Sequence, residues 1–357
     1  MSLQLFFPVP KYLTLPSVGF DISDEMIRFV ELVSEHNKIR LGRFGNVPIP
    51  QGVLQNGKIN DSDAFEKVLS TIQKKYDFSY IRASLPEEQV YLFTLKIPKV
   101  APAEIRSSIE FQLEDHLPIS AKEAIFDYEV LSEESDGYLL QISAVPENIV
   151  TTYALMLESA KLLPISLELE AQAIARAVVP ANDKNTYMIV DAGNTRTGIS
   201  FVSGGVVMFA TTVDIGGSMQ TEMIMKNFNV SFTEAEKMKR EHGLVRSDDN
   251  KELFSVLINS VSILRDEINK HYIFWHTHKD ETGRTHPRVE KIILCGGNAN
   301  MIGLSDYLAM SLRAPVVSAD VWSRIYDKNT DVPPMVESDS LSYATAIGLA
   351  LGSYDTK

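Results

Sequence analysis

The sequence predicts an α/β protein of two related lobes that face each other across a cleft, with a small α+β subdomain inserted into the first lobe. The main observation is a repeated βββα module. An apolar strand ending in an aspartate, a turn and a second strand occur as VGFDISDEMIRFVEL at residues 18–32 and again as IVDAGNTRTGISFVS at residues 189–203. Aligning the two segments places Asp21 on Asp191. The length of 357 residues also exceeds what one hydrophobic core usually supports.

The first lobe is predicted from residues 1–86. Alternating apolar residues indicate strands at 18–22, 26–33 and 39–47, and Asp61 or Ser62 caps the helix that follows. The segment YIRASLP at 80–86 is a buried strand. One face of the helix has the spacing of a core-facing stripe, with Phe65, Val68, Leu69, Ile72 and Tyr76.

Residues 87–163 are the predicted insert. They follow a β-α-β-β-α order, typical of a compact α+β unit: a strand at 90–98, a helix at 105–117, strands at 126–131 and 138–146, and a helix at 148–162. A helix at 168–179 then returns the chain to the first lobe. Residues 164–185 and the C-terminal helix 340–357 belong to that lobe as well.

Residues 186–339 are predicted to form the second lobe, which repeats the opening strand, turn, strand and hairpin. It includes a helical subdomain at about 228–285, in which Gly243 stops a helix that starts at 232 and a longer helix covers 253–272. A strand, a pair of glycines and a helix follow within 289–312.

The composition excludes several classes of function. A net charge of -13 and a pI near 5.1 argue against nucleic acid or an anionic membrane as a partner. The single cysteine, Cys295, indicates a small core residue and no oxidising compartment. The first sixteen residues do not read as a signal peptide, and no apolar run is long enough to span a bilayer. We therefore expect a cytoplasmic protein that meets the membrane only through a partner.

Three turns that follow apolar strands could hold phosphate groups. They are DAGNTRT at 191–197, DIGGS at 214–218 and CGGN at 295–298. Glycine lets the backbone approach an anion closely, and amide groups at a turn or helix start point toward it. An aspartate at the end of a strand can hold Mg²⁺ through its water shell. One such turn alone is weak evidence, but three in this order favour a nucleotide site.

The chain resembles the actin, Hsp70 and sugar kinase superfamily and, within it, the PilM family of type IV pilus assembly proteins, relatives of the division protein FtsA. The motifs that carry the resemblance are LKIPKVAPAEIRSSIEFQLEDHLPIS, ELEAQAIARA, VDIGGSMQTEMI, FTEAEKMKREHG and KIILCGGNANMIGL. The resemblance implies an actin-like (ribonuclease H-like) fold of two lobes with ATP and Mg²⁺ in the cleft. It also implies an inserted subdomain in the first lobe.

Carried over residue by residue, the resemblance places the cofactor site as follows. The first phosphate turn contains Asp21 and Ser23, and Asp21 and Asp191 hold Mg²⁺ through water. Glu236 and Lys239 reach ribose and adenine, although without the resemblance this pair would read as an exposed salt bridge. The remaining expected contacts are Gly193, Asn194, Thr195 and Thr197 in the second turn, Gly216 and Gly217 near the terminal phosphate, and Gly296, Gly297 and Asn298 near adenosine.

The first phosphate turn departs from the family pattern of Asp-Ile-Gly followed by small hydroxylated residues. Here it reads Asp21-Ile22-Ser23-Asp24-Glu25. Ser23 adds a Cβ, and two carboxylates beside a triphosphate repel it. We therefore expect weakened nucleotide affinity, or binding without useful hydrolysis, and at most a weak ATPase.

The resemblance implies a scaffold of the pilus assembly platform that grips the cytoplasmic N-terminal tail of a PilN-like membrane protein. An extended peptide would lie in an apolar groove between the first lobe and the insert, with the face of Ile105, Ile109 and Leu113 as a candidate lining. For any one of these residues, the core of the insert is the simpler interpretation. Pilus assembly ATPases and a second copy of the chain are further candidate partners.

Two alternatives stay open from the sequence. An FtsA-like filament protein would tether itself through a basic amphipathic tail, which does not follow the last core helix here. A small-molecule kinase would need a catalytic carboxylate that no motif indicates.

Overall fold

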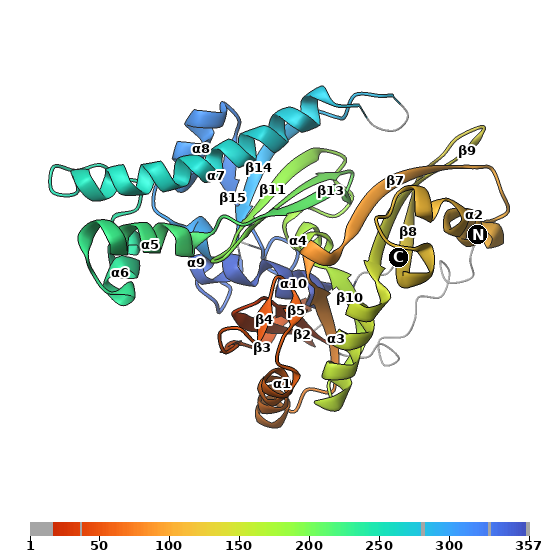
Figure 1. The fold of residues 1–357 in the computed structure, drawn as a ribbon, viewed down its shortest axis with the longest axis horizontal. Helices are drawn as coiled ribbons and strands as arrows, with labels where there is room; N and C mark the ends of the chain where they lie inside the picture. Colours follow the sequence, from red (N-terminus) through yellow and green to blue (C-terminus); the bar gives the residue numbers. More distant parts are fainter. Residues whose placement is uncertain (1–16, 36–37, 280–282, 328–329, 355–357) are drawn as a thin grey trace.

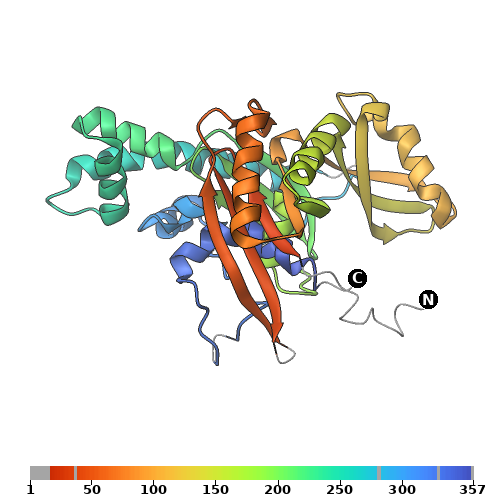
Figure 2. The same cartoon turned by 90° about the horizontal axis from the view of Figure 1, so that it is seen from below.

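The computed structural model describes residues 17–35, 38–279, 283–327 and 330–354. Two five-stranded sheets form the centres of two lobes, and an insert and a pair of helices project at opposite ends of the long axis (Figures 1 and 2). In the described parts of the chain, no helix has the length and apolarity needed to cross a bilayer. The leader at 1–16 lies outside the described residues.

The two sheets have the same strand order and directions. In each, the central strand pairs antiparallel with the second strand of a meander, and that strand pairs antiparallel with the third. On its other side, the central strand pairs parallel with a later strand. The predicted duplication is therefore confirmed. The first sheet has the order β10-β6-β1-β2-β3, formed by β1 (Val18–Ile22), β2 (Met26–Glu35), β3 (Lys38–Pro48), β6 (Tyr80–Leu85) and β10 (Leu163–Leu169). The second has the order β13-β12-β11-β14-β15, formed by β11 (Thr186–Ala192), β12 (Thr197–Ser203), β13 (Val206–Val213), β14 (Val289–Cys295) and β15 (Val316–Ser318).

The strand β10 was not predicted. Its sequence is LPISLEL, and the last two of these residues fall in the helix predicted at 168–179. The helix, α4 (Glu170–Val178), begins two residues later than expected because Glu168 and Leu169 still pair with β6. β10 lies at one edge of the first sheet.

Two helices, α4 and α10 (Ala344–Leu351), lie between the sheets (Figure 1). Every residue of α10 is buried. A Cβ added at Gly348 would lie 1.8 Å from the carbonyl oxygen of Ala173, and one at Gly19 would lie 2.0 Å from that of Ala346. The C-terminal helix thus packs tightly against both α4 and β1, and it fixes the lobes at their common base.

The first lobe is completed by α1 (Ser62–Tyr76) and a short hairpin of β4 (Leu54–Gln55) and β5 (Lys58–Ile59). Asp61 is the N-cap of α1, and its side chain accepts a hydrogen bond from the amide of Ala64, as predicted. Phe65, Leu69 and Ile72 are the fully buried members of the predicted stripe.

The insert is a three-stranded antiparallel sheet of order β7-β9-β8 covered by one helix. Its core is separate from those of the lobes. The helix that follows it, α3, instead buries Tyr153 and Leu157 in the core of the first lobe. The limits of the insert at residues 87 and 163 stay a prediction. By its packing, however, α3 belongs with the first lobe. The elements are β7 (Tyr91–Pro98), α2 (Ile105–Gln112), β8 (Ala124–Glu133), β9 (Gly137–Pro146) and α3 (Glu147–Ser159).

The second lobe carries the helical end of the molecule (Figure 1). Gly243, with a φ of +51°, ends α6, as predicted. Trp275 near the end of α7 is buried and stacks on Phe201 of the sheet. The helices are α5 (Gly217–Phe228), α6 (Phe232–His242), α7 (Lys251–Thr277), α8 (Leu304–Leu312) and the short α9 (Glu337–Ser340).

Candidate functional site

A cavity of about 700 Å³ lies between the two lobes and is lined by residues from both. It collects most of the cofactor residues that the sequence predicted: Asp21, Ser23, Asp191, Gly193, Asn194, Thr195, Glu236, Lys239, Gly296, Gly297 and Asn298. Three predicted residues, Thr197, Gly216 and Gly217, lie behind the lining. Segments far apart in the sequence therefore meet in one place, although whether they bind nucleotide stays a prediction.

Asp21 and Asp191 occupy equivalent positions, each at the end of the first strand of its sheet. Asp21 pairs in register with Arg28, and Asp191 with Gly198. Burial raises the pKa of Asp21 to about 6; the charge of Asp191 adds to this rise and Arg28 opposes it. Burial likewise raises the pKa of Asp191. Asp21 is buried, Asp191 is half-buried, and both line the cavity, an arrangement suited to a cation.

Arg28 is a lining residue that the sequence analysis missed. One of its terminal nitrogens lies 3.9 Å from Asp21 Oδ2, and its charge lowers the pKa of both aspartates. The signal was present in the sequence, because the antiparallel register of a tight hairpin places Arg28 directly opposite Asp21. It supplies positive charge at the floor of the cavity.

The first residues of α5 support the turn at 191–197, which is called the second turn because it corresponds to the first turn at 21–25. The amide of Gly217 donates to the carbonyl of Gly193, and the amide of Ser218 donates to that of Asn194. A Cβ added at Gly216 would lie 2.2 Å from the same Asn194 oxygen. Gly216 and Gly217 therefore support the turn by close packing. Thr197 has a similar role, because its buried hydroxyl donates to the carbonyl of Ile215.

The turn CGGN at 295–298 requires glycine at position 296. Gly296 has a φ of +87°, and an added Cβ would lie 2.4 Å from Asp191 Oδ1 and 2.5 Å from the carbonyl oxygen of Ala192. Its amide donates to Leu341, just before α10. The 3₁₀ turn Gly297–Asn300 that follows presents Gly297 and Asn298 to the cavity.

Lys239 and Glu236 are not an ordinary exposed ion pair. Lys239 is 6% exposed, and its Nζ lies 2.5 Å from Glu236 Oε1. The same nitrogen donates to the carbonyl of Gly217 and to the hydroxyl of Thr221 on α5. Burial lowers the pKa of Lys239. The pair joins α6 to the start of α5 at the wall of the cavity.

The two acids of the first turn bind protein groups. Asp24 accepts hydrogen bonds from the amides of Asn56 and Gly57, at 2.9 and 3.1 Å. Glu25 accepts one of 2.8 Å from the side chain of Asn194. Ser23 Oγ donates to the carbonyl of Met26 within the turn. Asp24 therefore joins the first turn to the β4–β5 hairpin of its own lobe, and Glu25 joins it to the opposite lobe.

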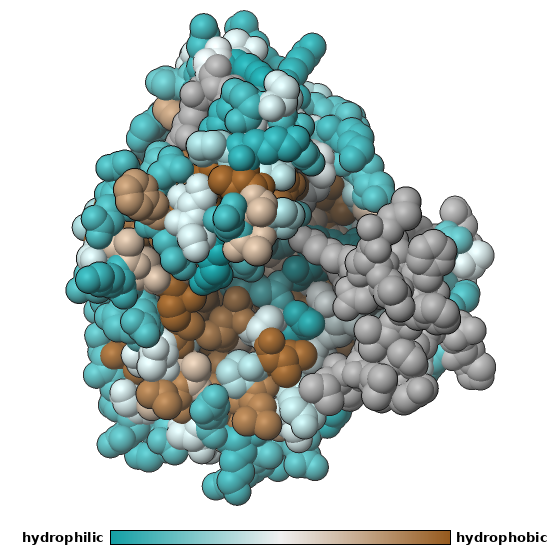
Figure 3. Space-filling model, turned by 90° about the vertical axis from the view of Figure 1, so that its right-hand side faces the viewer, coloured by the Kyte–Doolittle hydropathy of each residue, from teal (hydrophilic) through white to brown (hydrophobic). Residues whose placement is uncertain are grey.

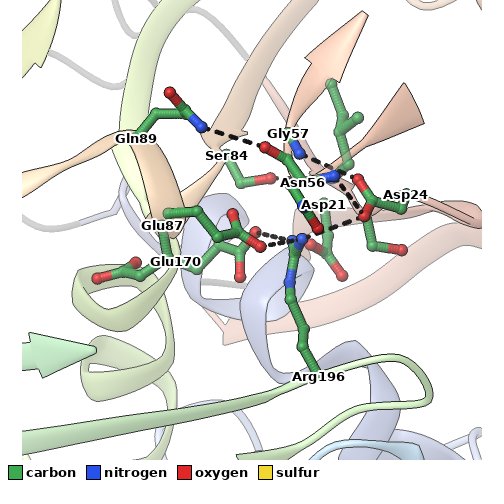
Figure 4. Close-up of polar contacts among 12 residues, drawn as sticks. Asp21, Asp24, Asn56, Gly57, Ser84, Glu87, Gln89, Glu170 and Arg196 are labelled. Atoms are coloured by element: carbon green, nitrogen blue, oxygen red, sulfur yellow. Dashed lines mark hydrogen bonds and ion pairs between the residues drawn. The ribbon is translucent and has the colours of Figure 1, made fainter. Parts of the chain in front are cut away.

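Arg196 is surrounded by carboxyl groups in this region (Figure 4). Burial raises the pKa of Glu87 to about 7 and that of Glu170 well above its usual value. Burial also raises the pKa of Glu88, and the charge of Arg196 opposes this rise. None of these four residues was predicted as a site residue. They come together only through the fold, and no local spacing marks them.

The candidate lining of the peptide groove was wrong. Ile105, Ile109 and Leu113 are at most 5% exposed and form the core of the insert. Other apolar residues are open to solvent: Leu163 and Ile165 on β10 and Ile125 on β8. Figure 3 shows apolar residues gathered in a hollow on the side of the molecule toward which β8 and β10 lie in Figure 1.

Two lobes with duplicated sheets, an aspartate at the same point of each, and a cavity between them define an actin-like protein. Solved structures with this fold agree. A structure of MreB5 of Spiroplasma citri bound to ADP has a TM-score of 0.53 and 15% identity, covering 94% of this chain and 95% of that one. The ethanolamine utilization protein EutJ of Carboxydothermus hydrogenoformans has a TM-score of 0.57 and 15% identity, covering 96% and 91%.

The family described as type IV pilus assembly protein PilM matches residues 19–354, and the chain belongs to this family. A solved PilM-PilN type IV pilus biogenesis complex has a TM-score of 0.78 and 20% identity, covering 96% of this chain and 100% of that one. The cell division protein FtsA of Staphylococcus epidermidis is 20% identical over 189 residues, 47% of this chain. That match spans only 39% of the FtsA chain.

Proposed function

We propose that the protein is a nucleotide-binding scaffold on the cytoplasmic face of the pilus assembly platform, where it docks on the N-terminal tail of a PilN-like membrane protein. The observation that carries this proposal is the cavity between two equivalent aspartate-bearing hairpins, in a chain of the PilM family. The membrane would be reached through the partner.

ATP would lie in the cavity with its phosphates toward Asp21, Arg28 and the second turn. The residues present fit such a group, because Arg28 offsets phosphate charge and the carboxyl groups of Asp21 and Asp191 can hold hydrated Mg²⁺. Gly297, Asn298, Glu236 and Lys239 would line the adenosine end. Mg²⁺ would neutralise the phosphates; the chain itself would only bind and orient them.

Affinity for ATP would be weak because the altered first turn adds negative charge where phosphate must enter. Glu25 lines the cavity and already bonds to Asn194. Calorimetric titration with Mg-ATP tests this, and an Asp191→Asn variant, which removes one charge from the metal position, is the control for binding in the cleft. Tight binding together with steady phosphate release would contradict the proposal of a weak site.

The partner peptide would bind at the apolar hollow on the insert side. Edge strands such as β10 offer unpaired backbone groups, and the exposed side chains of Leu163 and Ile165 add apolar contact. The solved PilM-PilN complex supports a partner of this kind.

Fluorescence anisotropy with a labelled N-terminal peptide of a PilN-like protein tests docking. Ile165→Asp should weaken binding at least tenfold, because it places a charge in the apolar contact. Met310→Asp on α8, where the side chain is 80% exposed, is the matched control. Equal affinities of the two variants would reject this surface. Repeating the titration with Mg-ATP and with Asp191→Ala shows whether nucleotide controls docking.

A further inference from the structure

Arg196 crosses the cleft from the second lobe and contacts three acidic residues. Asp24 and Glu88 belong to the first lobe, and Glu170 starts α4, the helix between the sheets. Arg196 lies on the turn between β11 and β12. Its terminal nitrogens contact Glu88, lie 3.5 Å from Asp24 Oδ2 and lie 3.4 Å from Glu170 Oε1 (Figure 4). Its side chain is only 13% exposed. One guanidinium thus contacts two segments of the opposite lobe and the helix between the sheets.

The three acids are themselves fixed in position. Asp24 receives the amide hydrogen bonds of the β4–β5 hairpin at Asn56 and Gly57. Glu88 lies in the 3₁₀ turn Glu87–Gln89 that follows β6, and Glu170 is the first residue of α4. The guanidinium therefore meets a preformed group of carboxylates and does not simply reach toward mobile surface acids.

A second contact crosses the cleft beside the first. Asn194, two residues before Arg196, donates to Glu25 at 2.8 Å. The back of the same turn accepts hydrogen bonds from the first amides of α5, and Lys239 continues the connection to α6. The turn at 193–196 is thus the point where the helical end of the second lobe is tied to the first lobe.

Electrostatics favours this closed arrangement. The charge of Arg196 is itself shielded from water and needs acidic partners, and its planar guanidinium can offer separate donors to all three acids. Opening the lobes would leave the acids together without their counter-ion. A bound phosphate is a poorer explanation for Arg196, because the donors that would face it already contact acids.

We propose that Arg196 is a latch that holds the two lobes together across the cleft. The latch consists of Arg196 with Asp24, Glu88 and Glu170. Arg196 and Glu170 line the cavity, and Asp24 and Glu88 contact Arg196 beside it. The latch does not depend on the proposed nucleotide, and a failure of ATP to bind would leave it intact.

The distance between the lobes in the nucleotide-free, full-length protein tests the latch. Spin labels at Lys67→Cys on α1 and Arg246→Cys beyond α6 report on the two lobes, because both positions are exposed and the native Cys295 is buried. Arg196→Met keeps most of the side-chain volume and removes the charge. Arg43→Met is the matched control, because the ion pair of Arg43 with Glu31 lies within the first lobe.

We expect a single narrow distance distribution for the native sequence and for Arg43→Met. Arg196→Met should broaden it and shift its mean by more than about 2 Å, the scale of a domain rearrangement. An unchanged distribution in a folded Arg196→Met protein would overturn the proposal. If that variant does not fold, Glu88→Gln removes one acid without leaving another unpaired, and it should produce a smaller change in the same direction. No change in Glu88→Gln would then reject the latch.

Discussion

The ammonium group of Lys239 donates a hydrogen bond of 3.0 Å to the carbonyl oxygen of Gly217, so a charged side chain of α6 supports the first residue of α5. The hydroxyl of Thr221 and the carboxylate of Glu236 complete its surroundings. Since the amide of Gly217 holds the second turn, the position of Lys239 bears directly on the wall of the cavity.

Replacing Lys239 with Met should therefore destabilise the protein. We expect the free energy of unfolding to fall by about 2 kcal/mol, the cost of losing a shielded, charge-assisted hydrogen-bond network. Urea denaturation measures the change. Lys237→Met is the control, since its pair with Glu241 is exposed and should contribute about 0.5 kcal/mol or less. A similar small effect of both variants would mean that Lys239 behaves as a surface residue.

Gly296 offers a second stability test, because its conformation and its surroundings both exclude a side chain. Gly296→Ala should cost about 1–3 kcal/mol for the backbone conformation, with φ at +87° and ψ at 163°, and about 1–3 kcal/mol more for the contact of Cβ with Asp191 and Ala192. Gly205→Ala is a control without the steric contact, since Gly205 has a φ of +84° and no atom within 4 Å of the added Cβ. Urea denaturation of both proteins should show a clearly larger loss for Gly296→Ala. Equal losses of unfolding free energy in the two variants would mean that the contact of Cβ with Asp191 and Ala192 costs nothing.

The fold was predictable where its signals are local. Strand alternation and the repeated aspartate gave both hairpins, and capping at Asp61 and Gly243 gave helix ends at the correct places. β10 escaped because Pro164 interrupts it and its pairing partner, β6, is distant in the sequence. The alternation of Leu163, Ile165, Leu167 and Leu169 is the local signal that could have identified this strand.

The candidate site was predictable in its glycines and aspartates but not in its charge balance. Arg196 stands inside a recognised turn, yet its partners Asp24, Glu88 and Glu170 come from three distant segments. The same limit applies to Lys239: the spacing of Glu236 and Lys239 indicates an exposed helix pair, and only the packing of α5 against α6 buries it. Burial of a charge is a tertiary property.

Glu87 should make stability depend on pH. Burial first, and then the charge of Glu88, raise its pKa from 4.5 to about 7, so the folded protein keeps a proton that the unfolded chain releases above pH 4.5. The contribution of this group is full below pH 4.5, declines as the pH rises to 7 and is then constant. Relative to Glu87→Gln, the native protein should lose about 3 kcal/mol over this interval.

Denaturation at a series of pH values measures this difference. Glu31→Gln is a control of opposite sign, because the hydrogen bond from Arg43 lowers the pKa of Glu31 against the effect of burial. Its contribution is present above pH 4.5 and is lost as the pH falls through the lowered pKa. A constant difference between the native protein and Glu87→Gln from pH 4.5 to 7 would show that Glu87 is ionised in the folded state.

Glu25 gives the most direct test of why the first turn should weaken nucleotide binding. Its exposed carboxylate lines the cavity and accepts a hydrogen bond from Asn194, which a glutamine oxygen can also accept. Glu25→Gln therefore removes one negative charge and keeps the cross-cleft contact. We expect Mg-ATP to bind roughly 3- to 10-fold more tightly, the scale of a single charge near a partly solvated site. Calorimetric titration at low and high salt measures the change, which should shrink as salt screens it.

Glu35→Gln, at the exposed end of β2, is the control and should leave the affinity unchanged. If Glu25→Gln binds no better than the native protein, the geometry of the turn at Ser23, and not its charge, limits the affinity.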